Sequence, residues 1–226
     1  VAYALVAWQT AYLKAHYPRQ FMAASMTQDR GNQERLAVYV RECRRVGIKV
    51  LAPDIAKSDV MFKLEGDNSI RYALTAIKGA GSDAMQAIVD EREANGAYAD
   101  LLDLFGRIEP RYLTKRQLEA LTFAGVFDSL EPNRAKIIAN SELLLAHGHA
   151  AFEAKNSNQI GLFGGGSEAE SEAMTPTLSD NIENWDSFTQ LDKELSVFGF
   201  YLQGHPLDAY AQQLARRTDL VPVNSV

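Results

Sequence analysis

The sequence is poor in cysteine and in long apolar runs. Cys43 is the only cysteine in 226 residues, so no internal disulfide can form, and a reducing cytoplasm is the simplest setting. No apolar stretch approaches the roughly 18–20 residues that a membrane-spanning helix needs, so we expect no membrane partner. The chain also lacks a Walker loop and a Gly-x-Ser-x-Gly elbow. These absences exclude disulfide-framework and membrane classes and two common kinds of catalytic site.

Candidates for a metal or a nucleophile are few. His147 and His149 form a pair at close spacing, but no carboxylate or cysteine lies near them at ligand spacing, and we predict no metal site. Cys43 lies on the apolar side of an expected helix and is predicted to be core. We therefore expect neither a catalytic residue nor a cofactor in this chain.

The net charge of −6 is unevenly distributed along the chain. The segment from Ser167 to Leu195 holds eight acids and one base, which leaves 22 bases against 21 acids in the other residues. Because local patches decide whether phosphate can bind, a nearly neutral body does not exclude a nucleic-acid partner. The chain has no initiating Met and opens at helical spacing, so we expect a piece of a longer protein.

Hydrophobic spacing predicts a mainly α fold with a small β element. Helices are expected over residues 3–26 with a break at Pro18, and over 32–46 with Leu36, Val40 and Cys43 on the inner face. A short strand at 48–53 and a β-hairpin within 59–74 should follow. Further helices are expected at residues 82–95, 98–105, 114–123, 133–155, 185–200 and 207–217.

The segment "IKGAGSDA" carries the clearest chemistry. Gly79 and Gly81 permit a sharp turn and a close backbone approach just before a helix begins. The unpaired amides of such a helix start favour an anion, and Lys78 adds positive charge. This pattern is typical of a helix-hairpin-helix, which holds the sugar-phosphate backbone through Lys78, Gly79, Ala80, Gly81 and Ser82. An ordinary interhelical turn remains an equal alternative at this point.

A second turn, "FAGVFDSL", is predicted to be mainly structural. It has one glycine and no adjacent base, and its apolar residues have core spacing: Leu118, Leu121, Phe123, Val126 and Phe127. Lys115 and Arg116, at the start of the preceding helix, could reach a phosphate or form a solvated face.

Residues 156–184 are expected to be a flexible acidic linker that contains "NQIGLFGGG". Ile160, Leu162 and Phe163 are apolar residues of the kind that folded proteins bury. The residues alone favour docking of Leu162 and Phe163 on this chain's own surface over docking on another protein.

Five blocks in order resemble the alpha subunit of bacterial DNA polymerase III: "AYALVAWQTAYLKAHYPRQFMAA", "RECRRVGIKVLAPDI", "IRYALTAIKGAG", "LTKRQLEALTFAGVFDSL" and "ELSVFGFYLQGHPLDAY". The resemblance covers nearly the whole chain apart from the linker. It implies the end of a fingers domain at 1–46, a tandem helix-hairpin-helix domain at 47–155, the linker at 156–184, and C-terminal helices at 185–226 that lead to an absent OB domain.

The family's polymerase site is a carboxylate cluster with two Mg²⁺ ions in a palm domain, which the resemblance places outside this chain. The resemblance thus implies an inactive piece of a DNA-directed DNA polymerase. Clamp-binding peptides of this family resemble Gln159, Leu162 and Phe163 here, with Gly164 following. An apolar pocket of the sliding clamp would receive Leu162 and Phe163.

The expected function is therefore DNA binding and clamp tethering, with double-stranded DNA, the sliding clamp and other polymerase III holoenzyme subunits as partners. One alternative is a stand-alone helix-hairpin-helix adaptor of a repair or nuclease complex. Another is a piece that only docks replication subunits and carries a vestigial hairpin.

Overall fold

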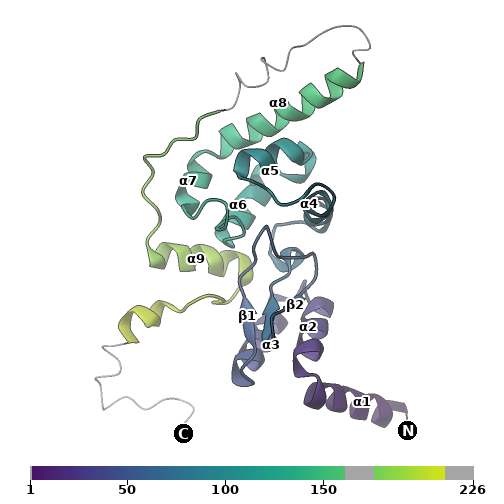
Figure 1. The fold of residues 1–226 in the computed structure, drawn as a ribbon. Helices are drawn as coiled ribbons and strands as arrows, with labels where there is room; N and C mark the ends of the chain where they lie inside the picture. The colour runs from purple at the N-terminus through teal and green to yellow at the C-terminus, as the bar shows by residue number, and fades with distance from the viewer. Residues whose placement is uncertain (1, 161–175, 212–226) are drawn as a thin grey trace.

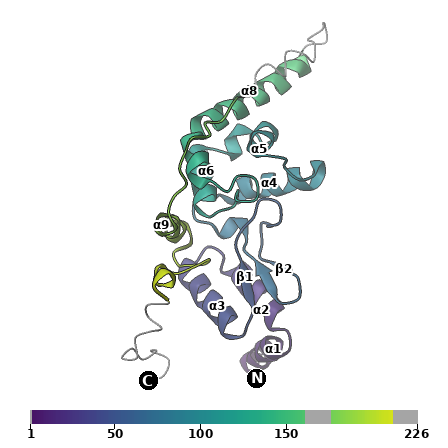
Figure 2. The same cartoon turned by 60° about the vertical axis from the view of Figure 1, so that its left-hand side comes forward.

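The computed structural model describes residues 2–160 and 176–211, with side chains from residue 3 to 157 and from 176 to 211. Helices α1–α3 and a small sheet form one end of the molecule, and α4–α8 form the other (Figure 1). Helix α9 lies beside the region where these two parts meet, as a second view also shows (Figure 2). The predicted mainly α class with a small β element is confirmed.

The first part begins with three helices. The predicted break at Pro18 is real: Pro18 occupies the first position of the second helix, where its missing N–H costs nothing. Asn32 caps the third helix by accepting a hydrogen bond from the Arg35 amide at 3.1 Å. The bounds are α1 Ala2–His16, α2 Pro18–Gln28 and α3 Gln33–Arg45.

The sheet has three short strands in the order β1-β3-β2. The predicted hairpin forms from β2 (Lys63–Glu65) and β3 (Ser69–Arg71), which are antiparallel with Leu64 opposite Ile70. Strand β1 (Lys49–Leu51) joins β3 in parallel with Val50 opposite Ile70. The local sequence patterns predicted these strands. They did not predict the pairing of β1 with β3, because the two strands are distant in sequence.

The second part is helical. The single helix expected at 133–155 is instead two, because the Asn140 side chain donates to the Lys136 carbonyl at 2.9 Å and ends the first of them. The elements of this part are η1 Leu74–Ala76, α4 Ser82–Asn95, α5 Leu101–Arg107, η2 Pro110–Tyr112, α6 Lys115–Phe123, α7 Arg134–Ala139 and α8 Ser141–Ile160.

Residues 176–186 lack regular structure, yet they are bound to α7. The Ser179 amide donates to Asn140 Oδ1 at 2.9 Å, and Asn133 Nδ2 donates to the Ile182 carbonyl at 2.6 Å. Lys136 Nζ lies 2.6 Å from Asp180 Oδ1. The last part of the predicted linker is therefore held on the protein, and it leads into α9 (Ser187–Phe198) and η5 (Pro206–Tyr210).

One continuous apolar core joins the two parts. Cys43 is fully buried as predicted, and burial raises the pKa of its thiol to about 11. The predicted core of the second turn is also buried, with Phe123 half-buried. Helix α1 differs, because its apolar side chains lie exposed in this structure, with Trp8 at 63%.

Candidate nucleic-acid interface

The turn between η1 and α4 requires glycine at two positions. Gly79 has a φ of +92° and Gly81 a φ of +79°, which is the region that residues with a Cβ rarely adopt. Helix α4 has Gly81 as its N-cap and no side-chain cap. Ser82 and Asp83 lie inside the helix, at its first two positions. The start of α4 thus presents amides that no capping side chain accepts from.

The same turn packs closely on α6. A Cβ added at Gly79 would lie 3.3 Å from Ala120 Cβ and 3.8 Å from Arg116 Nε. One added at Gly81 would lie 3.6 Å from Gln117 Nε2. Lys78 is exposed and Ala80 fully buried. The fold therefore brings Arg116 to the Lys78–Ser82 turn, although the two are distant in sequence.

The neighbouring Lys115 is exposed at the start of α6. Its Nζ lies 3.7 Å from Glu142 Oε1, and both side chains are open to solvent. Such an exposed pair contributes little to stability. Lys115 therefore keeps a charge that is available to a ligand.

The backbone of Lys78 is anchored by α9. Its amide donates to the Val197 carbonyl at 3.1 Å, and Gln33 Nε2 donates to the same carbonyl at 2.9 Å. Gly199 ends α9 in the left-handed conformation, and a Cβ there would lie 2.8 Å from Gln33 Oε1. The C-terminal end of α9 thus joins α3 to the first hairpin.

The second turn differs from the first. Gly125 has a φ of +74° and corresponds to Gly79 of the first turn. The position that corresponds to Gly81 is occupied by Phe127, which is buried. The Arg134 guanidinium fills the space over Gly125, since an added Cβ would lie 2.2 Å from Arg134 Nη2. This turn already holds a cation of its own protein and offers no open approach to a phosphate.

Arg134 belongs to a buried ionic cluster. Its Nη1 lies 2.9 Å from Glu194 Oε1, and its Nη2 lies 2.6 Å from Asp128 Oδ2. Gln203 Nε2 also donates to Glu194 Oε1, while Glu194 Oε2 is buried and has no hydrogen-bond partner among the described residues. Burial raises the pKa of the Glu194 carboxyl, because one guanidinium shared with Asp128 does not replace the lost water. The cluster fixes α9 to the second turn.

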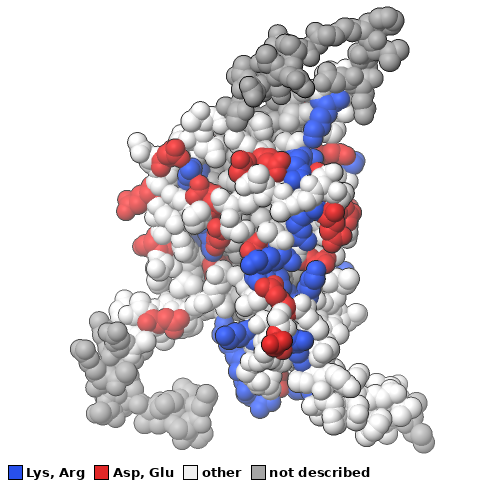
Figure 3. All heavy atoms as spheres, viewed as in Figure 1, with Lys and Arg blue, Asp and Glu red and all other residues white. Residues whose placement is uncertain are grey.

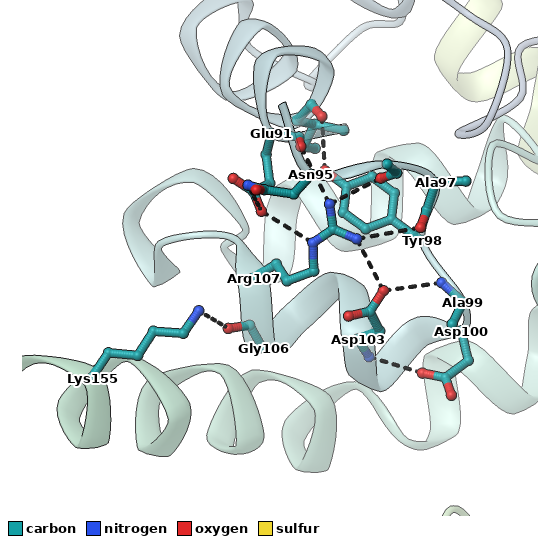
Figure 4. A network of polar contacts seen from close by, with 12 residues as sticks. Glu91, Asn95, Ala97, Tyr98, Ala99, Asp100, Asp103, Gly106, Arg107 and Lys155 are labelled. Atoms are coloured by element: carbon teal, nitrogen blue, oxygen red, sulfur yellow. Dashed lines mark hydrogen bonds and ion pairs between the residues drawn. The ribbon is translucent and has the colours of Figure 1, made fainter. Parts of the chain in front are cut away.

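A second polar cluster orients α4 on α5 (Figure 4). Arg107 Nε lies 3.0 Å from Glu91 Oε1, and its Nη2 donates to the Gly96 carbonyl at 2.9 Å. Its guanidinium stacks 4.5 Å from the centre of the Tyr98 ring. Since these groups already pair with it, Arg107 acts in the structure and is not part of the candidate interface.

The surface charges are mixed. Basic and acidic side chains intermingle on the face shown in Figure 3, with one basic area at its lower end over α3 and β1. Two arginines at the end of α3 have partners in the protein: Arg44 donates to the Tyr201 and Leu202 carbonyls, and Arg45 pairs with Glu42 at 2.7 Å.

The predicted clamp-binding residues lie at the edge of the described chain. Gln159 is in the last turn of α8, whereas Leu162 and Phe163 lie outside the described residues. Within the described ranges, no group of three or more histidine, cysteine or acidic side chains could hold a metal ion. Over the same ranges, no helix is both long enough and apolar enough to cross a membrane.

Sequence reasoning missed several residues around the first turn and α9. Arg111 and Gln117 lie close to the start of α4, and Arg134 pairs with Glu194. The only signal for Arg134 is its place directly after Asn133, which caps α7. Nothing local marks Glu194, because its partner is 60 residues away.

The sequence is similar to those of known proteins, and the similarity includes both turns. Residues 47–137 match a protein family described as the helix-hairpin-helix motif. The sequence is 43% identical to DNA polymerase III subunit alpha of Neisseria meningitidis serogroup A over 213 residues, or 94% of this chain. The chain is homologous to a segment of DNA polymerase III subunit alpha. The resemblance found in the sequence is thereby confirmed.

Other subunit alpha relatives agree. The protein of Caulobacter vibrioides is 43% identical over 96% of this chain, and that of Escherichia coli K12 is 39% identical over 95%. The chain spans only 18% of the length of each of these relatives.

Proposed function

We propose that this chain holds the backbone of double-stranded DNA through its first hairpin, without reading base sequence, as part of a polymerase III alpha subunit in the bacterial cytoplasm. One observation carries the proposal: the Gly79–Gly81 turn presents the uncapped start of α4 beside Lys78 and Arg116. It lies within the residues that match the helix-hairpin-helix family.

The chemistry of this turn suits a phosphate. Backbone amides at the start of a 14-residue helix can donate to phosphate oxygens at the positive end of its dipole. Lys78 and Arg116 add charge from two different elements. Because phosphates carry no sequence information, the contact fixes position and not base identity.

The test measures binding to a fluorescent duplex by anisotropy across a range of salt concentrations. Lys78→Glu should weaken binding and make the slope of log affinity against log salt shallower by about one unit. Lys57→Glu, which changes an exposed lysine outside the turn in the same way, is the matched control. A duplex of scrambled sequence should bind equally well. Unchanged binding by Lys78→Glu would refute the hairpin assignment.

Gly81→Val tests the backbone part of the proposal. A valine at a φ of +79° is strained, so the turn must shift and the amides of α4 lose their placement. Binding should fall while circular dichroism shows retained helix content. Binding equal to wild type would mean that the amides do not contact DNA.

We further propose that Gln159, Leu162 and Phe163 tether the chain to a sliding clamp. The supporting observation is their sequence pattern, which begins at Gln159 in the last turn of α8 and continues beyond the described residues. Leu162→Ala with Phe163→Ala should abolish clamp binding and leave duplex binding unchanged. Ile160→Ala, at a variable position of the pattern, is the control. Equal clamp affinity in the double variant would end the tether proposal.

Under this proposal the chain is not catalytic, and the nucleotidyl transfer with its Mg²⁺ ions takes place in other parts of the parent subunit. The proposal also includes other polymerase III holoenzyme subunits as binding partners of this chain. We keep the division into 1–46, 47–155, 156–184 and 185–226 as a proposal. A stand-alone adaptor is the alternative, and a polymerase core with clustered aspartates in the same reading frame would exclude it.

A further inference from the structure

The first hairpin lies between two open hollows. The first, of about 530 Å³, is lined by residues 30–34, which form the end of the α2–α3 turn and the start of α3, and by residues 75–78. The second, of about 440 Å³, is lined by residues 81–84 together with Arg111, Tyr112 and Gln117. The Gly79–Gly81 turn therefore separates two depressions that different parts of the fold complete.

Each hollow contains one exposed arginine from outside the hairpin. Arg30 makes a hydrogen bond to the Thr27 carbonyl at 3.1 Å. Arg111 pairs with Glu109 at 2.7 Å while its side chain remains 67% exposed. Exposed contacts of this kind are weak, so either guanidinium can exchange its partner for a phosphate at small cost.

Each hollow also contains one acid. Glu34 lies in the first turn of α3 and lines the first hollow, and Asp83 lies in the first turn of α4 and lines the second. A carboxylate repels phosphate, so these two side chains reduce the affinity of the surface.

The form of duplex DNA places backbone phosphates on both sides of one that is held at the turn. Each strand carries a phosphate about every 3.4 Å along the helix axis. A phosphate held by the turn between Lys78 and Ser82 therefore has neighbours toward both hollows. A guanidinium can bind such a phosphate through two parallel hydrogen bonds.

We propose that the duplex-binding surface spans both hollows, with Arg30 and Arg111 each binding a backbone phosphate and Glu34 and Asp83 limiting the affinity. This inference rests on the proposed function and adds contacts from the α2–α3 turn and from η2.

The experiment compares arginine variants of the 226-residue chain by the same salt-dependent anisotropy. Arg30→Ala and Arg111→Ala should each make the salt slope shallower by about 0.9, the value for one lost phosphate contact. Arg45→Ala is the control, because Arg45 is equally exposed at 70% and pairs with Glu42. It lies at the far end of 13-residue α3, roughly 20 Å along the axis from its start.

Removal of the acids should give the opposite result. Glu34→Gln and Asp83→Asn should each strengthen duplex binding by about two- to fivefold at low salt, since exposed charge contacts are worth up to about 1 kcal/mol. This gain cannot come from misfolding, so it separates a binding effect from a loss of structure.

The outcomes distinguish the two proposals. In one outcome, Lys78→Glu weakens duplex binding, both arginine variants bind as Arg45→Ala does, and the acid variants show no gain. This outcome overturns the two-hollow surface and keeps the hairpin assignment. Weaker binding by the arginine variants and not by Lys78→Glu overturns the hairpin assignment and keeps the basic surface. No effect of any variant overturns both.

Discussion

Replacement of Glu194 by alanine should destabilise the protein strongly, because it breaks the buried cluster that joins α9 to the second turn. Glu194 and Arg134 are almost fully buried, with side chains 4% and 5% exposed. The substitution leaves Asp128 as the remaining carboxylate partner of the Arg134 guanidinium among the described residues, and it removes the acceptor of the Gln203 amide. It also leaves a cavity in the core beneath α9.

The magnitude follows from this geometry. Removal of one partner from a buried ion pair typically costs 3–5 kcal/mol, and here Asp128 still compensates part of the charge. We therefore expect a loss of about 3 kcal/mol in the free energy of unfolding. For a domain of this size, this corresponds to a fall of roughly 6–12 °C in Tm.

Thermal unfolding by calorimetry and urea titration would measure the loss. Asp192→Ala is the matched control, because Asp192 lies on the same helix and is exposed. The double variant Arg134→Met with Glu194→Met removes both charges. It should be more stable than Arg134→Met alone or Glu194→Met alone. Equal effects of Glu194→Ala and Asp192→Ala would refute the reasoning about the cluster.

Three further predictions concern single residues. Gly125→Ala should cost roughly 1–3 kcal/mol by calorimetry, because the new Cβ strains the turn and displaces Arg134, and an unchanged Tm would refute the packing argument. Hydrogen bonds from Arg45 and then Lys14 lower the pKa of Glu42 from 4.5 to about 2, so its contribution to stability is present above pH 4.5 and is lost as the pH falls toward 2. Glu42→Gln should flatten this acid limb in unfolding scans against pH, and an unchanged limb in this variant would contradict the role of the Glu42 pairing. The Cys43 thiol should react with a thiol reagent at the rate of global unfolding, and rapid reaction in the native state would contradict its burial.

Much of the fold could be predicted because its signals are local. The break at Pro18, the cap at Asn32 and the hairpin around Gly66 each depend on residues within a few positions of one another. The two-glycine turn was also visible, since a positive φ is a property of a single residue.

The exposed face of α1 shows what apolar spacing does not determine. Leu5, Trp8 and Tyr12 have the spacing of a buried stripe, but they are exposed in the described structure. Periodicity shows that a face is apolar, and it does not show what covers that face.

Local sequence was thus sufficient for most of the helices, for the hairpin turns and for the core of the second turn, since these depend on dihedral preferences and on apolar spacing. The tertiary structure alone decided that the first turn is open to a ligand and that the second turn is filled by an arginine of the same protein. It placed Arg116 beside Gly79, and it placed Arg134 over Gly125 with Glu194 from a helix 60 residues away. Contacts at such separations depend on how whole elements pack, and no short stretch of sequence contains that information.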